Sequence, residues 1–228
     1  MAIGNEVDAI VNDGVLPQRE VLDHILEGAV HVKQLDPEVA VTSTLTGDSN
    51  LNLPTFTNEL VAGLDMISFN TYCLNSSDLT VSSPGAWVDV LTRWRRTAGE
   101  KQFFVQELGC PVGYGDESQG APSNLPNGIG GSTQLQSEFF AFYLQQLRED
   151  DQFRGATIFQ LYDWSPELAK MFSNSIRVEE NHLAADRLEE WLATVGLCRW
   201  SDVSCRPAWS VVLDEMALSE AVRGALSQ

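Results

Sequence analysis

The stretch Phe103-Phe104-Val105-Gln106-Glu107-Leu108-Gly109 decides the fold of this chain. It belongs to a short apolar and aromatic run at residues 101–105, which lies between Gly99-Glu100 and Gly109-Cys110-Pro111. A run of this length and composition predicts a buried strand of a parallel sheet. The strand ends in a carboxylate, Glu107, where the chain turns into a loop rich in glycine, proline, asparagine and serine. Because ligands bind at the carboxyl ends of parallel strands, Glu107 is the first candidate functional residue.

A second carboxylate follows the same pattern near the start of the chain. Residues 2–6, Ala-Ile-Gly-Asn-Glu, have an apolar beginning and a polar end, which predicts another strand that ends at Glu6. Two carboxylates at the ends of two parallel strands are the pair that glycoside hydrolysis requires. One would attack the anomeric carbon, while the other would protonate the leaving oxygen and later activate water. We therefore predict Glu6 and Glu107 as catalytic residues.

Strands and helices alternate along the chain. We expect strands at residues 2–6, 39–45, 65–74, 101–107 and 155–164. We expect helices at residues 17–35, 56–64, 85–97, 133–150, 183–195 and 207–226, a polar connection at 7–15 and a long loop at 109–132. This order is the βα pattern of an α/β protein with a parallel sheet. About five βα units are visible, whereas a closed (β/α)8 barrel has eight.

The strand expected at residues 65–74 has two distinct faces. Because side chains alternate along a strand, Asn70 and Ser68 share the face of Tyr72. If Tyr72 points into a barrel, these polar side chains line its interior. Phe69 then faces the surrounding helices.

The chain is strongly acidic, with a formal net charge of -18 and a pI near 4.3. Such a charge repels a phosphate backbone and an anionic membrane surface, so we expect no nucleic acid and no membrane as partners. A neutral carbohydrate substrate fits better. No apolar run reaches the length of a membrane span, and the spacing of cysteine and histidine indicates no metal site. We expect no cofactor.

The four cysteines suggest one disulfide, with a second left open. Cys198 and Cys205 flank a short Arg-Trp-Ser-Asp-Val-Ser turn, which favours a bridge between them. Cys73 and Cys110 each follow an expected strand and could be neighbours, but a bridge between them is the less favoured alternative.

Several polar and aromatic motifs stand in a fixed order at the expected strand ends. They are Gly4-Asn5-Glu6, then Tyr72, then Glu107-Leu108-Gly109, then Trp164, with Arg206-Pro207-Ala208-Trp209 in the tail. This order resembles the clan A glycoside hydrolases, a large (β/α)8 superfamily that includes β-mannanases, endoglucanases, β-galactosidases and β-glucuronidases. In that clan an Asn-Glu pair ends the fourth strand, a tyrosine the sixth, a glutamate the seventh and an aromatic residue the eighth.

The resemblance implies a fold, a reaction and a role for each matching residue. The fold would be a partial (β/α)8 TIM barrel that covers strands four to eight, with residues 1–228 as a single catalytic domain. The reaction would be retaining hydrolysis of a β-linked oligo- or polysaccharide, with Glu107 as nucleophile and Glu6 as acid/base. Asn5 would hydrogen-bond the sugar 2-hydroxyl, Tyr72 would donate to Glu107, and Trp164 would stack on the sugar face.

The chain departs from the clan pattern at its beginning. The first three βα units, and an arginine that the clan usually carries on strand two, have no counterpart. Absent strands would leave open sheet edges and an uncovered interior. We expect foremost an incomplete gene product or trimmed fragment; a separate chain could supply the rest, or two copies could pair their open edges. A fragment alone is expected to have little or no activity. The clan's habit and the predicted disulfide indicate an extracellular protein, although this chain carries no signal peptide.

Two other functions stay open. A non-catalytic carbohydrate-binding relative would keep the pocket as a recognition site, and loss of sugar affinity without turnover in Glu107→Ala would support it. Another (β/α)8 or doubly wound enzyme, such as a metal-dependent hydrolase, is disfavoured because no histidine stands at an expected strand end. Among other polar residues, we interpret Asp163 as a cap of the following segment, and Asp48 and Asn50 as loop residues.

Overall fold

The computed structural model of the chain describes residues 1–46, 53–75, 79–114, 128–175 and 182–226. It divides into two compact units. The first, here called the sheet unit, consists of Met1–Thr71, Gly85–Leu108 and Leu147–Thr157. The second, here called the disulfide unit, consists of Tyr72–Pro84, Gly109–Gln146 and Ile158–Gln228. Asp48 and Asn50 lie outside the described residues, and a single catalytic domain stays a prediction.

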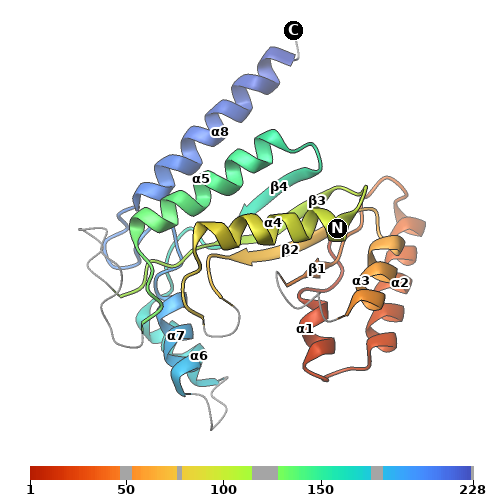
Figure 1. The fold of residues 1–228 in the computed structure, drawn as a ribbon, viewed down its shortest axis with the longest axis horizontal. Helices are drawn as coiled ribbons and strands as arrows, with labels where there is room; N and C mark the ends of the chain where they lie inside the picture. Colours follow the sequence, from red (N-terminus) through yellow and green to blue (C-terminus); the bar gives the residue numbers. More distant parts are fainter. Residues whose placement is uncertain (47–52, 76–78, 115–127, 176–181, 227–228) are drawn as a thin grey trace. The chain divides into compact units, whose positions relative to one another are not determined.

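The sheet unit is built on a parallel sheet, which has four strands in the described part of the chain (Figure 1). The strands stand side by side in sequence order: β1 (Thr44–Leu45), β2 (Ile67–Tyr72), β3 (Phe103–Gly109) and β4 (Phe153–Ile158). Where β1 pairs with β2, Thr44 lies opposite Ser68 and Leu45 lies opposite Phe69. Parallel neighbours need crossover connections, and helices provide them here. The predicted α/β class is therefore confirmed.

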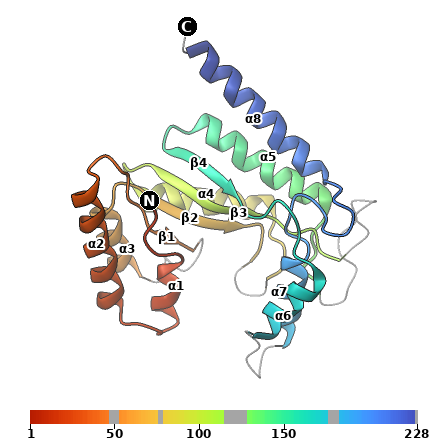
Figure 2. The ribbon, with the colours of Figure 1, turned by 180° about the vertical axis from the view of Figure 1, so that it is seen from behind.

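The helices packed in the sheet unit are α1 (Val7–Asn12), α2 (Gln18–Leu35), α3 (Pro54–Gly63) and α4 (Pro84–Ala98). Helices α1 and α2 precede β1, whereas α3 connects β1 to β2 and α4 connects β2 to β3. In α2 the buried residues recur at helical spacing: Val21, Leu22, Ile25 and Ala29. The helix stops before Asp36-Pro37, because the residue before a proline disfavours helical backbone. Figure 2 shows α2 lying beside α3, against which it packs.

The disulfide unit holds the later helices. They are α5 (Thr133–Glu149), most of which lies in this unit, α6 (Pro166–Ser175), α7 (His182–Leu192) and α8 (Pro207–Leu226). The sequence did not predict α6, although it carries both start signals: Pro166 at the first helical position, and Ser165, whose Oγ accepts a hydrogen bond from the Leu168 N–H at 3.2 Å. No helix among the described residues combines the length and hydropathy needed to cross a bilayer.

The prediction of a strand at residues 2–6 is wrong. Ala2 forms only an isolated parallel bridge with Thr42, and the Ile3 N–H donates to the Thr42 carbonyl at 2.8 Å. The chain then turns at Gly4 and Glu6, whose φ angles of 78° and 51° lie outside the strand region. Helix α1 follows directly, where a polar connection was expected.

Three other expected strands are shorter than predicted. The one at residues 39–45 is reduced to β1, the one at residues 65–74 to β2, and the one at residues 155–164 ends at Ile158. Gln160 has a φ of 67°, which interrupts the extended backbone. Trp164 therefore lies in the connection between β4 and α6 and not at the end of a strand.

Aromatic rings fill the core between the sheet and α4. Phe69 of β2 stacks on Trp94 of α4 with 4.9 Å between ring centroids, and Phe103 of β3 stacks on Phe153 of β4 at 5.1 Å. All four side chains are buried. Phe69 thus faces the helices, as the alternation predicted, and its neighbour Ser68 faces the other side of the sheet.

Replacing Trp94 by alanine tests this core. Trp94→Ala removes a fully buried ring and is expected to lower the free energy of unfolding by about 3–5 kcal/mol. Val88 lies on the same helix but is 51% exposed, so Val88→Ala should change that free energy by less than about 0.5 kcal/mol. Urea denaturation followed by circular dichroism measures both, and equal losses in the two variants would contradict the assigned core.

Candidate active site

A strained turn presents Asn5 and Glu6 beside the sheet. Gly4 and Glu6 both have left-handed backbone, which costs a residue with a side chain roughly 1–2 kcal/mol. The turn also needs a glycine for space, because a Cβ at Gly4 would lie 2.6 Å from Val7 Cγ1. The Glu6 carbonyl accepts the Ala9 N–H at 3.0 Å and so begins α1. Strain of this kind at a carboxylate is typical of functional positions.

Asn70 of β2 joins the two predicted site residues of this turn. Its Nδ2 donates to Asn5 Oδ1 and to Glu6 Oε1, each at 3.1 Å. Asn70 is buried, whereas Asn5 is exposed and Glu6 is half-buried. Asn70 Nδ2 carries two N–H donors, so one donor can serve Asn5 Oδ1 and the other Glu6 Oε1. The alternation along β2 predicted the direction of Asn70 but not its two partners.

Gln106 of β3 completes this group, and sequence reasoning missed it. Its Nε2 donates to Asn5 Oδ1 at 3.5 Å, and its Oε1 accepts a hydrogen bond from the Thr44 hydroxyl. Thr44 in turn shares a 2.8 Å hydrogen bond with the hydroxyl of Ser68. Asn5 Oδ1 therefore accepts from two amides, which leaves Asn5 Nδ2 as the donor for a ligand. The only feature of the sequence that could have pointed to Gln106 is its position directly before Glu107.

Glu107 lies on β3 directly after Gln106, two residues before the strand ends at Gly109. Its side chain is half-buried. Asn5, Glu6, Asn70 and Glu107 all belong to the sheet unit. The described hydrogen bonds connect Asn5, Glu6, Asn70 and Gln106, and the pairing of Glu6 with Glu107 stays a prediction.

Asp8, a further carboxylate in this region, ties α1 to the end of β1. It is fully buried, and its two oxygens accept hydrogen bonds from the Thr46 N–H at 2.9 Å and the Thr46 hydroxyl at 2.7 Å. Burial raises the pKa of Asp8 above its usual 3.8, while the bonds from Thr46 act in the opposite direction. Because both oxygens are used by Thr46, Asp8 has a structural and not a catalytic position.

Tyr72 and Trp164, the two predicted aromatic site residues, belong to the disulfide unit. The Tyr72 ring meets Phe159 and Trp191 edge-on, with centroids 5.5 and 4.9 Å apart. Trp164 lines a pocket of about 300 Å³ together with Trp200 and others. The predicted roles of Tyr72 and Trp164 toward a substrate stay predictions.

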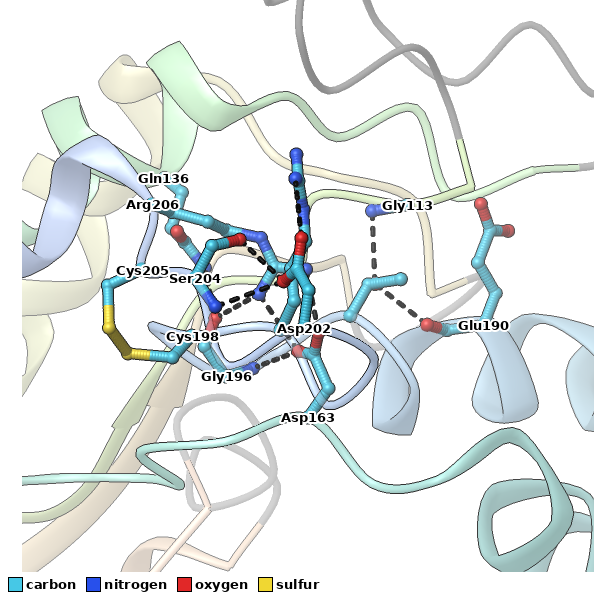
Figure 3. Close-up of polar contacts among 12 residues, drawn as sticks. Gly113, Gln136, Asp163, Glu190, Gly196, Cys198, Asp202, Ser204, Cys205 and Arg206 are labelled. Atoms are coloured by element: carbon cyan, nitrogen blue, oxygen red, sulfur yellow. Dashed lines mark hydrogen bonds and ion pairs between the residues drawn. A yellow bond between two sulfur atoms is a disulfide. The ribbon is translucent and has the colours of Figure 1, made fainter.

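A buried ion pair holds the backbone next to Trp164 (Figure 3). The Arg206 guanidinium donates to both oxygens of Asp163, at 2.9 and 2.7 Å, and also to the Gly196 carbonyl. The Gly196 N–H donates to Asp163 Oδ1 at 2.9 Å. Asp163 was expected to cap the following segment, but Ser165 does so. The partner of Asp163 lies 43 residues away, so local sequence could not identify it.

Both pairs of cysteines form disulfides in the disulfide unit. The predicted bridge between Cys198 and Cys205 is confirmed and closes a hairpin. Cys73 and Cys110, the less favoured pair, are also joined, because β2 and β3 are neighbours and both residues follow directly after them.

Comparison with solved structures finds similar folds in several glycosidases. The chain is similar to a glycoside hydrolase family 17 β-1,3-glucanosyltransferase from Rhizomucor miehei, with 12% identity, a TM-score of 0.53 and coverage of 91% of this chain and 61% of that one. A GH2 β-galacturonidase from Eisenbergiella tayi gives 19% identity, a TM-score of 0.54 and coverages of 94% and 32%. Bacteroides uniformis β-glucuronidase gives 16% identity and a TM-score of 0.51, with coverage of 90% of this chain and 22% of that one.

At these identities the likeness concerns the fold: a parallel α/β arrangement like part of the TIM barrel of these enzymes. The chain spans from about a fifth to about three fifths of the length of these neighbours. No known family profile and no curated protein matches the sequence.

The ion pair between Asp163 and Arg206 can be tested by removing one partner. Arg206→Met leaves the Asp163 carboxylate buried without its cation, and we expect a loss of about 3–5 kcal/mol in the free energy of unfolding. The double variant Asp163→Leu/Arg206→Met should recover part of that loss, because no charge stays buried. Thermal and urea unfolding measure both variants. Wild-type stability in the single variant would contradict the pair's structural role.

The burial of Asp8 predicts a pH-dependent contribution to stability. Since the folded pKa is raised above the unfolded value of 3.8, this carboxyl stabilises the fold most at low pH, and the contribution falls as pH rises through the folded pKa. Asp8→Asn removes the titration. The difference in unfolding free energy, wild type minus variant, should therefore decrease from about pH 3 to about pH 6. A difference that increases over this range would show that the pKa shift has the opposite sign.

Proposed function

We propose that this chain carries the site of a retaining glycoside hydrolase that acts on a β-linked oligo- or polysaccharide, with Glu6 as acid/base and Glu107 as nucleophile. The observation that carries the proposal is the pair of hydrogen bonds from Asn70 to Asn5 and Glu6. A buried amide that holds a strained carboxylate beside an exposed asparagine is an arrangement for binding and proton transfer. It lies in a fold that glycosidases share.

The proposed reaction has two displacements. First, a Glu107 oxygen bonds to the anomeric carbon while the bond from that carbon to the leaving oxygen breaks, and Glu6 gives its proton to the leaving oxygen. Then water attacks the glycosyl-enzyme, Glu6 takes the water's proton, and Glu107 is released as a carboxylate. Asn5, oriented by Asn70 and Gln106, donates its Nδ2–H to the sugar 2-hydroxyl. That hydrogen bond strengthens in the transition state.

The proposed substrate is a neutral glycan. The net charge of -18 would repel a polyanion, whereas it leaves a neutral sugar polymer unaffected. The proposal also places the protein outside the cell, because structural disulfides such as Cys73–Cys110 and Cys198–Cys205 persist in oxidising compartments.

A carbohydrate-binding site without turnover is the second candidate, and the position of Gln106 favours it. Neighbouring side chains leave a regular strand on opposite faces, and Gln106 is the residue of β3 whose side chain reaches Asn5. In that case Glu107 would face away from the sugar. The amides of Asn5, Asn70 and Gln106 would then recognise hydroxyl groups without chemistry.

Trapping of a glycosyl-enzyme separates the two candidates. The chain is incubated with a panel of neutral deoxyfluoro-glycosides, which form a slowly hydrolysed glycosyl-enzyme, and is then analysed by intact-mass spectrometry and peptide mapping. We expect one added sugar on Glu107, and no label in Glu107→Gln. Glu100→Gln is the matched control, since this exposed carboxylate lies in the turn that precedes the same strand and should leave labelling unchanged.

Glu6→Gln tests the acid/base role separately. We expect kcat/KM for an unactivated glycoside to fall by about a hundredfold to ten-thousandfold. Aryl glycosides whose leaving group needs no proton should still label the variant. A label on another carboxylate would refute the assignment of the nucleophile. Sugar binding by the folded chain without any label would favour the second candidate.

A further inference from the structure

The pocket beside Trp164 has features that the proposed chemistry does not use. Its volume of about 300 Å³ lies at the small end of the range for ligand sites. Three aromatic residues, Tyr114, Trp164 and Trp200, line it, and the polar residues Ser201 and Arg199 also belong to its lining. Apolar walls with a few polar groups are the usual lining of a small-molecule site.

Trp200 is the unusual member of this lining. It is 60% exposed, although a tryptophan ring gains stability when it is buried. It lies in the hairpin closed by Cys198–Cys205, in which the Arg199 N–H donates to the Ser204 carbonyl at 2.8 Å. The side chain of Asp202 accepts from both the N–H and the hydroxyl of Ser204. The ring is therefore carried on a braced segment while it stays open to solvent.

Trp164 and Trp200 are held to one framework. The Asp163 N–H donates to the Cys198 carbonyl at 3.0 Å, and the Cys198 N–H donates to the Leu161 carbonyl at 2.8 Å. The Asp163–Arg206 ion pair fastens the other side of the hairpin to the same segment. The backbone at both tryptophans is thus held in place before any ligand arrives, which lowers the entropic cost of binding.

The charges around the pocket favour a neutral ligand. The pKa of Tyr114 is raised to about 12. Burial is the largest cause, and the negative charges of Glu189, Glu190 and Asp163 act in the same direction. The Tyr114 hydroxyl therefore stays protonated and can donate a hydrogen bond. The guanidinium of Arg199 lies 3.9 Å from the Asp202 carboxylate, which partly offsets its charge. An anionic ligand would meet net repulsion.

We infer that Trp200 and Trp164 form a subsite that binds one neutral sugar ring, with Trp200 as a platform for its apolar C–H face. The ring hydroxyls meet Ser201, Arg199 and the Tyr114 hydroxyl. This assignment rests on the proposed function in one respect, because that function makes a sugar the ligand. It adds a residue that determines affinity and lies outside the group of Asn5, Glu6, Asn70 and Gln106.

Calorimetric titration with neutral β-linked trisaccharides tests the subsite on the full chain. Trp200→Ala should weaken binding about tenfold or more, because it removes the aromatic face on which the sugar ring is proposed to stack. Trp200→Tyr should keep most of the affinity, since it keeps an aromatic face. Val203→Ala is the matched control: Val203 is 64% exposed on the same hairpin but does not line the pocket. Circular dichroism confirms the fold of each variant.

The outcomes separate this inference from the proposed reaction. Unchanged affinity in Trp200→Ala, or wild-type chain that binds none of the neutral trisaccharides at millimolar concentration, overturns the subsite even if Glu107 is labelled. Loss of affinity in Trp200→Ala with no label on Glu107 supports the subsite and refutes the hydrolytic mechanism. Tighter binding of glucuronic acid than of a neutral sugar overturns the assignment of a neutral ligand.

Discussion

Parallel pairing of β1, β2 and β3 is the constraint on which the candidate active site depends. It brings the carboxyl ends of these strands to one edge of the sheet and gives the sheet two unlike faces. Phe69 and Phe103 point toward α4 and form the core. Asn70 and Gln106 come from the same strands and reach Asn5. Core and site are thus consequences of one pairing register.

Buried polar side chains on one face of the sheet carry a cost in folding free energy. A buried hydroxyl or amide that loses its partner costs about 1–3 kcal/mol, so each must be satisfied by another. Thr44, Ser68 and Gln106 satisfy one another in a row, and Asn70 Nδ2 is satisfied by Asn5 and Glu6, whereas the buried Asn70 Oδ1 has no hydrogen-bond partner among the described residues. Leucine or valine at these positions would stabilise the sheet more simply, and a role of the polar row in binding is part of the proposed function.

Sequence reasoning succeeded where the signal was local. The spacing of neighbouring residues indicates the buried face of α2 and the buried run of β3, and both were predicted. It failed where distant partners decide the outcome. Gln106 meets Asn5 across 101 residues, and Asp163 meets Arg206 across 43. The length of β1 and the left-handed turn at Glu6 depend on packing against other segments, so no local pattern specified them.

The left-handed backbone at Glu6 also bears on which residues are retained at position 6 during evolution. Glycine at this position would relieve the strain, so the chain is less stable than a simple substitution could make it. A strained residue is retained where its replacement would reduce activity, and it is replaced over time where activity does not depend on it. Position 6 can therefore serve as a marker in diverged copies of this sequence. Under the proposed function, a copy with glycine there would have exchanged the acid/base carboxylate for a more stable fold.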